Sequence, residues 1–415
     1  MTELYQLAFG PARQAFLDKL FALACATGGE ARLVGGVVRN ALLADCHGHI
    51  FDADQQDLDL AVNLPITAFA EVARDAGFSV YDTGLAHGTV TLRHGSQSAE
   101  ITQLRTDTDT DGRHAHIQAT DSWDEDARRR DFTINALYLD ASGRLFDPVG
   151  GLADLKAGQL RFVGDPARRL SEDHLRALRA LRFLASYPFL VMSDAGLAAM
   201  AAHVHLLPKL SAERIAAELH RLMAGPAARS VLLYAAELQL DHILFDAPFR
   251  TDALTHDGVA DIWDMLSFAS RLCICLPPGR RAAAAAARLR LSRADKTCLE
   301  QADKAADQAC LDQLLGENWP RSAYRLGAVA AVLALDHALH TGRILTADRL
   351  RQIVFFRPPT CPVRGRDVVQ HYGLNGPAVG LRLAALEQLW VDNDFTLSAS
   401  QLFSLYEKTN SSTGR

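Results

Sequence analysis

The spacing of apolar residues predicts a series of elements in the first part of the chain. Residues 11–28 have an amphipathic helical pattern that ends at Gly28-Gly29. A short apolar run then leads into Gly35-Gly36, and the segment VVRNALL that follows has helical spacing, so this glycine pair is expected in a turn before a helix at 37–44. Residues 57–62, DLDLAV, alternate polar and apolar positions, which predicts a strand with both carboxylates on one face.

The pattern continues with a predicted helix at 65–77 and with β-alternation at 79–105, where glycine-containing turns indicate a strand and a hairpin. Residues 106–119 are polar, lack apolar periodicity and are expected to form a loop. Beyond about residue 186 the chain is helical and rich in alanine, without a catalytic signature. Residues 365–395 predict a helix, a Gly-Pro break and a second helix ending in Trp390, which suits contacts to a structured RNA through shape and phosphates.

Two of these segments carry groups suited to phosphate and metal chemistry. Gly35 and Gly36 let the backbone approach an anion, the first N–H groups of the helix point at it, and Arg39 adds a fork of donors. Asp57 and Asp59 on one strand face repel each other, an arrangement that divalent cations stabilise. Taken alone, each motif is more often a tight turn or a solvated strand end. Together they predict phosphoryl transfer with Mg²⁺ bridging a triphosphate.

These motifs resemble those of the class II tRNA nucleotidyltransferases (CCA-adding enzymes) and bacterial poly(A) polymerases, within the DNA polymerase beta-like superfamily. The segment LVGGVVRN is similar to the family's LVGGxVRD, and DLDLA to DxDxA. Further similarity lies in EITQLR (100–105), RRRDFTINALYLD (128–140) and the block 147–183. The strong resemblance covers about residues 32–183, with a weaker one at 360–396.

The resemblance implies an α+β head domain with a short mixed β-sheet, followed by an all-helical neck, body and tail. We place the catalytic head at 1–155, the neck with a base-selecting helix at 156–230, and a tRNA-binding body and tail at 231–415. The head would hold Mg²⁺ on Asp57 and Asp59.

The resemblance also assigns roles to residues that follow the two aspartates. Glu100 would be a third carboxylate that helps deprotonate the attacking hydroxyl, the alternative being an edge-strand glutamate in solvent. Arg130 would reach the triphosphate, while Asp131 orients its neighbours. The residues expected to pack inward around them are Phe132, Ile134, Ala136 and Leu137. The DGRH sequence within 106–119 resembles the family's flexible loop, a mobile segment suited to act as a lid.

The segment EDHLRALRALR supplies candidate groups for choosing the base. Its spacing of three places Asp173, Arg176 and Arg179 along one side of a predicted helix, with Arg182 following. A carboxylate accepts the amino N–H of cytosine or adenine and a guanidinium donates to the adjacent ring acceptor, whereas uracil and guanine reverse these polarities. In isolation the same pattern is more often an ordinary salt-bridged helix face.

Three features depart from the family's pattern or suggest other chemistry. Asn40 stands where the family has aspartate beside the phosphate-binding arginine, and the missing charge bears on how Arg39 is held. Residues 44–56 are longer than the usual connection and are expected to be a solvated surface insertion. His256-Asp257 suggests a metal-dependent phosphohydrolase domain, but the further ligands cannot be placed, so that domain is judged absent.

Composition sets wider bounds. A chain of 415 residues, 49% hydrophobic and 22% charged, suits a folded protein of two to four domains. No signal peptide or membrane-spanning run is evident, and seven scattered cysteines indicate reduced thiols, so the cytoplasm is expected. The net charge of −6 does not by itself indicate an RNA-binding protein. Local groups of arginines nevertheless provide the positive charge that contacts to phosphates need.

The combined expectation is template-independent addition of CTP and ATP to the 3′ end of tRNA, with release of pyrophosphate. One alternative is a poly(A) polymerase with the same head motifs. Another is a catalytically weakened RNA-binding protein, which the Asn40 substitution favours and the intact aspartate pair opposes. The sequence leaves open the number of nucleotides added and the oligomeric state.

Overall fold

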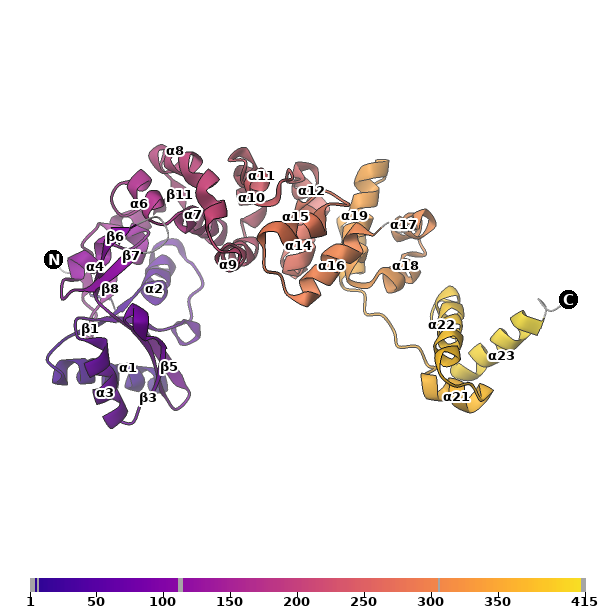
Figure 1. The fold of residues 1–415 in the computed structure, drawn as a ribbon, viewed down its shortest axis with the longest axis horizontal. Coiled ribbons are helices and arrows are strands. Elements are labelled where there is room, and N and C mark those ends of the chain that lie inside the picture. The colour runs from indigo at the N-terminus through magenta and orange to yellow at the C-terminus, as the bar shows by residue number, and fades with distance from the viewer. Residues whose placement is uncertain (1–3, 6, 111–114, 305–306, 412–415) are drawn as a thin grey trace. The chain divides into compact units, whose positions relative to one another are not determined.

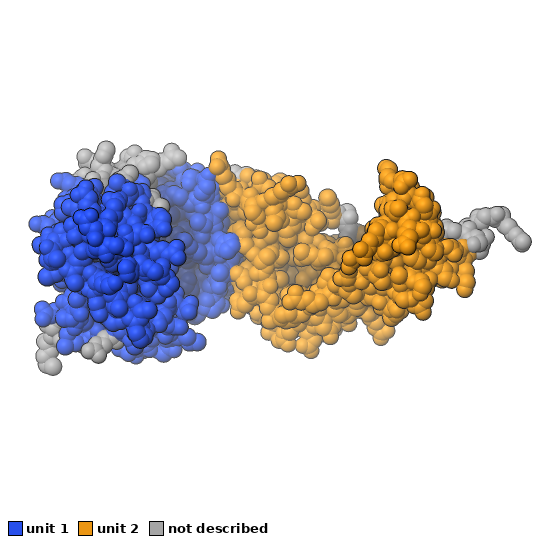
Figure 2. Space-filling view, turned by 90° about the horizontal axis from the view of Figure 1, so that it is seen from below, with its two compact units in different colours: residues 1–244 blue, residues 245–415 orange. Residues whose placement is uncertain are grey.

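The computed structural model describes residues 4–5, 7–110, 115–304 and 307–411. They form two compact units, residues 1–244 and 245–415 (Figures 1 and 2). The first unit contains the β-sheet and the second is helical throughout the residues described. This confirms an α+β domain followed by an all-helical part. The finer division at residues 155 and 230 stays a prediction.

The first unit is built on a mixed sheet with the strand order β3-β4-β5-β2-β1-β8-β9. Its strands are β1 (Ala31–Val34), β2 (Asp59–Val62), β3 (Ser79–Gly84), β4 (Thr89–His94), β5 (Gln97–Gln103), β8 (Tyr138–Leu139) and β9 (Leu145–Phe146). Strands β2 and β5 are parallel and the other neighbours are antiparallel. The parallel register places Asp59 beside Glu100, which brings two of the predicted carboxylates together at the start of β2.

Successive strand residues point to opposite sides of the sheet, so each strand can contribute apolar residues to a helix-packed face. Helices α1 (Pro11–Ala26) and α3 (Ile66–Asp75) pack against strands of the sheet and against each other, and confirm the predicted helices at 11–28 and 65–77. A second apolar cluster includes Trp123 of α4 (Trp123–Arg128) with Val34 and Tyr138 of the strands. The sheet is therefore buried on both faces at β1, whereas Glu100 lies on an exposed face of β5.

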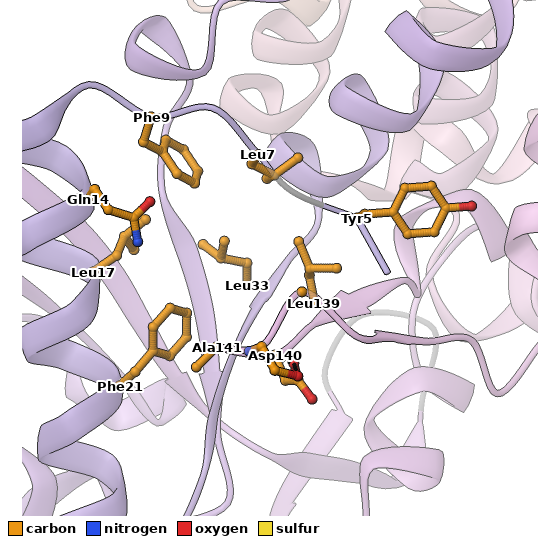
Figure 3. A pocket seen from close by; sticks show the side chains of 12 residues that line it. Tyr5, Leu7, Phe9, Gln14, Leu17, Phe21, Leu33, Leu139, Asp140 and Ala141 are labelled. Carbon is orange, nitrogen blue, oxygen red and sulfur yellow. Dashed lines mark hydrogen bonds between the residues drawn. The ribbon is translucent and has the colours of Figure 1, made fainter. Parts of the chain in front are cut away.

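The α1 face has a cavity of about 320 Å³ between the helix, the sheet and the N-terminal segment. Phe9, Leu17, Phe21, Leu33 and Leu139 surround it (Figure 3). The acidic side chain in its lining is Asp140, which accepts hydrogen bonds from the backbone N–H groups of Ser142 and Arg144 in its own turn. The cavity is thus a packing space beneath the N-terminal segment.

One predicted loop is a hairpin. Residues 106–119 were expected to lack regular structure, but β6 (Arg105–Thr110) and β7 (Ala115–Ala119) pair antiparallel in a separate two-stranded sheet. Threonine alternates with aspartate in the sequence of β6, and β-branched residues such as threonine favour strands. The DGRH sequence, residues 111–114, lies outside the described residues.

The first unit also contains helices between and after these strands. They are α2 (Gly36–His47), α5 (Gly151–Lys156), α6 (Pro166–Glu172), α7 (Leu175–Ser186), α8 (Asp194–His203), α9 (Ala212–Met223), α10 (Ala228–Glu237) and α11 (Leu240–Phe245), with the short parallel pair β10 (Gln159–Leu160) and β11 (Val191–Met192). Helix α7 packs against α9 and α10, so α9 forms one wall beside the predicted base-selecting residues.

The second unit begins at Phe245, the last residue of α11. Its helices are α12 (Thr251–Thr255), α13 (Asp257–Ile262), α14 (Phe268–Cys275), α15 (Arg281–Arg288), α16 (Arg293–Asp303), α17 (Gln308–Leu315), α18 (Trp319–Leu326), α19 (Ala330–Thr341), α20 (Ala347–Val354), α21 (Gly365–Tyr372), α22 (Pro377–Asp392) and α23 (Ala399–Ser411). The break before Pro377 and the buried Trp390 confirm the two helices predicted near the C-terminus. Within the described ranges, none of the helices has the length and apolar character needed to cross a membrane.

Candidate active site

Three carboxylates come together where strand β2 begins, beside strand β5. Asp59 opens β2, Glu100 lies beside it on β5, and Asp57 precedes the strand by two residues. All three line a cavity of about 470 Å³ whose wall also includes Arg13 of α1. The structure therefore brings together the three acidic residues that the sequence selected.

The electrostatics around these carboxylates suit a cation. Burial, followed by the charges of Glu100 and Asp57, raises the pKa of Asp59 to about 6, although Arg130 and Arg39 partly oppose the shift. The described residues include no closed cluster of three or more His, Cys, Asp or Glu arranged as metal ligands. Mg²⁺ is often held by one or two carboxylates and completes its shell with phosphate and water oxygens. Crowded, partly desolvated carboxylates that line a cavity fit that requirement.

The glycine turn lies against these carboxylates. Gly35 ends the turn between β1 and α2 with φ of +74°, a conformation that favours glycine. A β-carbon at this position would come within 3.4 Å of an Asp59 carboxylate oxygen. As the residue before the helix, Gly35 offers no side-chain acceptor to the first N–H groups of α2. The start of α2 therefore has the backbone geometry expected of an anion cradle.

Arg39 is held by neutral partners. Its Nε and one Nη donate to Oδ1 of Asn40 at 3.1 and 3.0 Å, and the other Nη donates to Oδ1 of Asn135 at 2.5 Å. The hydroxyl of Tyr187 accepts a further bond of 3.0 Å, and the guanidinium lies over the ring of Phe183. Asn40 thus orients the arginine without a carboxylate.

Arg130 is fixed by a buried acid that the sequence analysis missed. Asp126 on α4 is 1% exposed and accepts bonds from Arg130, Arg129 and the Tyr138 hydroxyl. Burial opposes ionisation of Asp126, but the two arginines outweigh it and hold its pKa at about 2. An acid four residues before an arginine is a helical ion-pair spacing that sequence inspection can detect.

The RRDFTINAL segment packs as predicted. Phe132, Ile134, Ala136 and Leu137 are no more than 1% exposed. The carboxylate of Asp131 accepts the N–H of Phe132 and the amide of Asn135, and pairs with Arg179. The predicted orienting role of Asp131 therefore matches its contacts.

The predicted base-selecting residues do not share one helix, and this prediction was wrong. Helix α6 ends at Glu172, Asp173 is extended with φ of −148°, and α7 begins at Leu175. One Asp173 oxygen accepts the N–H of Leu175 at 3.1 Å. Aspartate readily bonds to nearby backbone in this way, which interrupts a helix instead of continuing it.

Side chains around this break are engaged in different ways. Arg176 is 8% exposed and donates to the carbonyl of Arg169 and to Glu172. Asp173 pairs with Arg214 of α9 at 2.9 Å. Arg182 pairs with Glu218 of α9 at 2.7 Å, and Arg179 with Asp131. The α9 residues Arg214 and Glu218 were missed, since no local pattern links them to α7.

Comparisons with known proteins place similar sequences and folds beside this chain. The family described as "Poly A polymerase head domain" matches residues 31–161, and "Probable RNA and SrmB- binding site of polymerase A" matches residues 192–253. The CCA-adding enzyme of Lactobacillus helveticus is 37% identical over 229 residues, which are 55% of this chain and 54% of that protein. The matched segments of this chain are thus similar to the poly(A) polymerase head and RNA-binding families and to CCA-adding enzymes.

Further proteins extend this likeness. Mouse mitochondrial CCA tRNA nucleotidyltransferase 1 is 38% identical over 203 residues, 47% of this chain and 44% of that protein. The matched region thus spans about half the length of these curated relatives. A crystal structure of the Bacillus stearothermophilus CCA-adding enzyme with CTP has the same fold, with a TM-score of 0.72, 24% identity and coverage of 98% of this chain and 99% of that one.

The structure also differs from expectation at residues 44–56. Helix α2 continues to His47 and ends at Gly48, which has a left-handed φ of +63°. The His47 ring stacks on Phe189 with centroids 4.4 Å apart. The first part of the segment is therefore packed on the protein and is not a solvated loop, whereas Ile50 is 93% exposed.

Proposed function

We propose that this protein adds CTP and ATP to the 3′ end of tRNA without a nucleic-acid template and releases pyrophosphate. The observation that carries the proposal is the meeting of Asp57, Asp59 and Glu100 beside the glycine turn of α2. Arg39 and Arg130 lie near enough to lower the pKa of Asp59 against the effect of burial. Acidic groups for a cation and basic groups for phosphates thus adjoin, as phosphoryl transfer requires. Relatives named as CCA-adding enzymes support the choice of reaction.

In the proposed reaction, the chain's own residues bind and orient the reactants. Gly35 and Gly36 offer backbone N–H groups to the phosphates, and Arg39 and Arg130 add positive charge. Glu100 accepts the proton of the attacking 3′-hydroxyl or orients that group. Asp57 and Asp59 would hold Mg²⁺, which when bound neutralises phosphate charge and acidifies the attacking hydroxyl.

The proposed partners are tRNA, CTP and ATP. Asp173, Arg176, Arg179 and Arg182 would shape base choice, with Arg176 acting mainly by packing α6 against α7. The helical part would bind the tRNA, in keeping with the RNA-binding family match at 192–253. The proposed place of action is the cytoplasm, as the scattered cysteines predict.

A second candidate is a poly(A) polymerase, which the name of the matched head-domain family favours. A tRNA transcript lacking its CCA end separates the two when CTP and ATP are offered singly and together with Mg²⁺. CCA addition gives a short C extension with CTP alone and a three-nucleotide end with both. A polymerase gives a long tail with ATP alone. Addition of only C or only A identifies a partial activity, and no addition identifies a weakened RNA-binding relative.

We expect Asp173→Ala to reduce the selectivity for CTP and ATP over UTP and GTP. Its carboxylate would accept the amino N–H of cytosine or adenine, and a bidentate base contact is worth about 1–3 kcal/mol of discrimination. Incorporation of UTP or GTP relative to CTP and ATP should therefore rise roughly tenfold or more. Values of kcat/KM for the four nucleotides measure this.

Asp173 also pairs with Arg214, so a control is needed for loss of that contact. Arg214→Ala removes the same ion pair and leaves the carboxylate in place. Uniform loss with all four nucleotides in Asp173→Ala, together with a lower melting temperature, would identify Asp173 as a structural partner only.

A further inference from the structure

Asn40 lies at the centre of a polar network beside the phosphate-binding arginine. Its Oδ1 faces three donors, namely two nitrogens of Arg39 and the Tyr187 hydroxyl at 2.8 Å. Only an oxygen can accept all three bonds, so the orientation of the side-chain amide is determined. The Asn40 nitrogen therefore points the other way, where it donates to Oε1 of Gln56 at 2.7 Å.

Gln56 is fixed in turn by the segment that leads to the three carboxylates. Its side-chain nitrogen donates to the carbonyl of Asp52 at 3.3 Å, and its own backbone carbonyl accepts from the Arg13 guanidinium. Asp57 is the next residue. The Asn40–Gln56 amide pair thus links the turn before the acidic residues to the side chain of Arg39.

The charge balance around Arg39 differs from that of its neighbours. Arg130 is paired with Asp126 and Arg179 with Asp131. Arg39 instead bonds to two asparagines and a tyrosine, and in the described part of the chain no carboxylate lies within ion-pair distance of it. Its positive charge is oriented by hydrogen bonds but is not cancelled by a direct partner.

We propose that Asn40 and Gln56 are positioning residues that hold Arg39 through a neutral amide pair and so leave its charge available for the triphosphate of the incoming nucleotide. This inference rests on the proposed nucleotidyl transfer and adds the residues that orient Arg39 in its phosphate site. The aspartate of the family's pattern at this position would place a second acceptor oxygen against Oε1 of Gln56. Two acceptors at that separation repel, and turning the Gln56 amide to present its nitrogen would give up the bond to the Asp52 carbonyl. The observed orientation of Gln56 therefore matches asparagine at position 40.

The test compares Asn40→Asp with the wild-type chain in binding CTP, ATP and inorganic tripolyphosphate by calorimetry at several salt concentrations. Tripolyphosphate has no base, so it isolates the phosphate contribution. All three affinities should fall by a similar factor, about three- to tenfold, because one unit of charge near the phosphates is cancelled. The salt dependence of binding should also become weaker. Asn63→Asp, at the far end of β2 from Asp59, makes the same change in net charge and should bind like the wild type.

Equal affinities and equal salt dependence for Asn40→Asp and wild type would overturn the inference, as would an equal loss in Asn63→Asp. If Asn40→Asp does not fold, Gln56→Glu adds a carboxylate to the same amide pair and must weaken tripolyphosphate binding in the same direction. A wild-type chain that binds tripolyphosphate but extends no RNA would refute the proposed function and not this inference. Failure of the wild type to bind any of the three ligands would refute both.

Discussion

Asp59→Asn is expected to abolish nucleotide addition without destabilising the head. The carboxylate would act on charge that develops during the reaction, and removing one preorganised electrostatic group typically lowers kcat by about 10³-fold. The affinity for tRNA should stay within about twofold of the wild-type value, because Asp59 would contact the cation and the triphosphate and not the tRNA. Single-turnover extension and a gel-shift titration measure the two quantities.

The expected stability of Asp59→Asn separates loss of function from loss of structure. The raised pKa of Asp59 means that its ionised form is unfavourable in the folded protein, first because the carboxyl is partly buried and then because Glu100 and Asp57 lie beside it. Neutralising it should leave the melting temperature in the absence of metal unchanged or higher. Asp75→Ala, at the exposed end of α3, is the control and should retain activity. Near-normal turnover of Asp59→Asn would refute the proposed active site.

The sequence predicted best where local pattern and tertiary structure depend on the same residues. The apolar spacing after the glycine turn matches the start of a helix. The alternation around the aspartate pair and Glu100 matches half-buried strands. The parallel pairing of β2 with β5 then makes same-face carboxylates neighbours. Alternation alone placed Asp57 and Asp59 on one face, whereas the resemblance to the family was needed to place Glu100 beside them.

Prediction was weaker where long-range contacts decide the outcome. Spacing alone placed Asp173 and Arg176 on one helix, but a bond from Asp173 to the backbone divides it. Arg214 and Glu218 face α7 only because α9 packs there. Likewise, the neutral hold on Arg39 depends on Asn135, which is 96 residues away along the chain. Hydrophobic periodicity contains no information on such polar partners.

Asp126→Ala should cause a large loss of stability, because the buried carboxylate is shared by several donors. Its removal leaves Arg130 and the Tyr138 hydroxyl without their shared acceptor inside the head. Breaking a buried pair from one side costs about 3–5 kcal/mol, and the partial exposure of the arginines places the expected loss near the lower end, about 3 kcal/mol. Asp124→Ala on the exposed side of the same helix is the control, with an expected change within about 0.5 kcal/mol.

The dependence of this loss on pH follows from the lowered pKa of Asp126, about 2 in the folded protein against about 3.9 in an unfolded chain. A depressed carboxyl pKa stabilises the folded state above the unfolded value, and that contribution is lost as pH falls through the folded value. The stability difference between wild type and Asp126→Ala should therefore be constant from pH 7 to about 5 and shrink between about pH 4 and 2. Hydrogen exchange of the head sheet measures it region by region. A difference that does not change down to pH 2 would show that packing, and not the ion pairs to Arg129 and Arg130, makes Asp126 necessary.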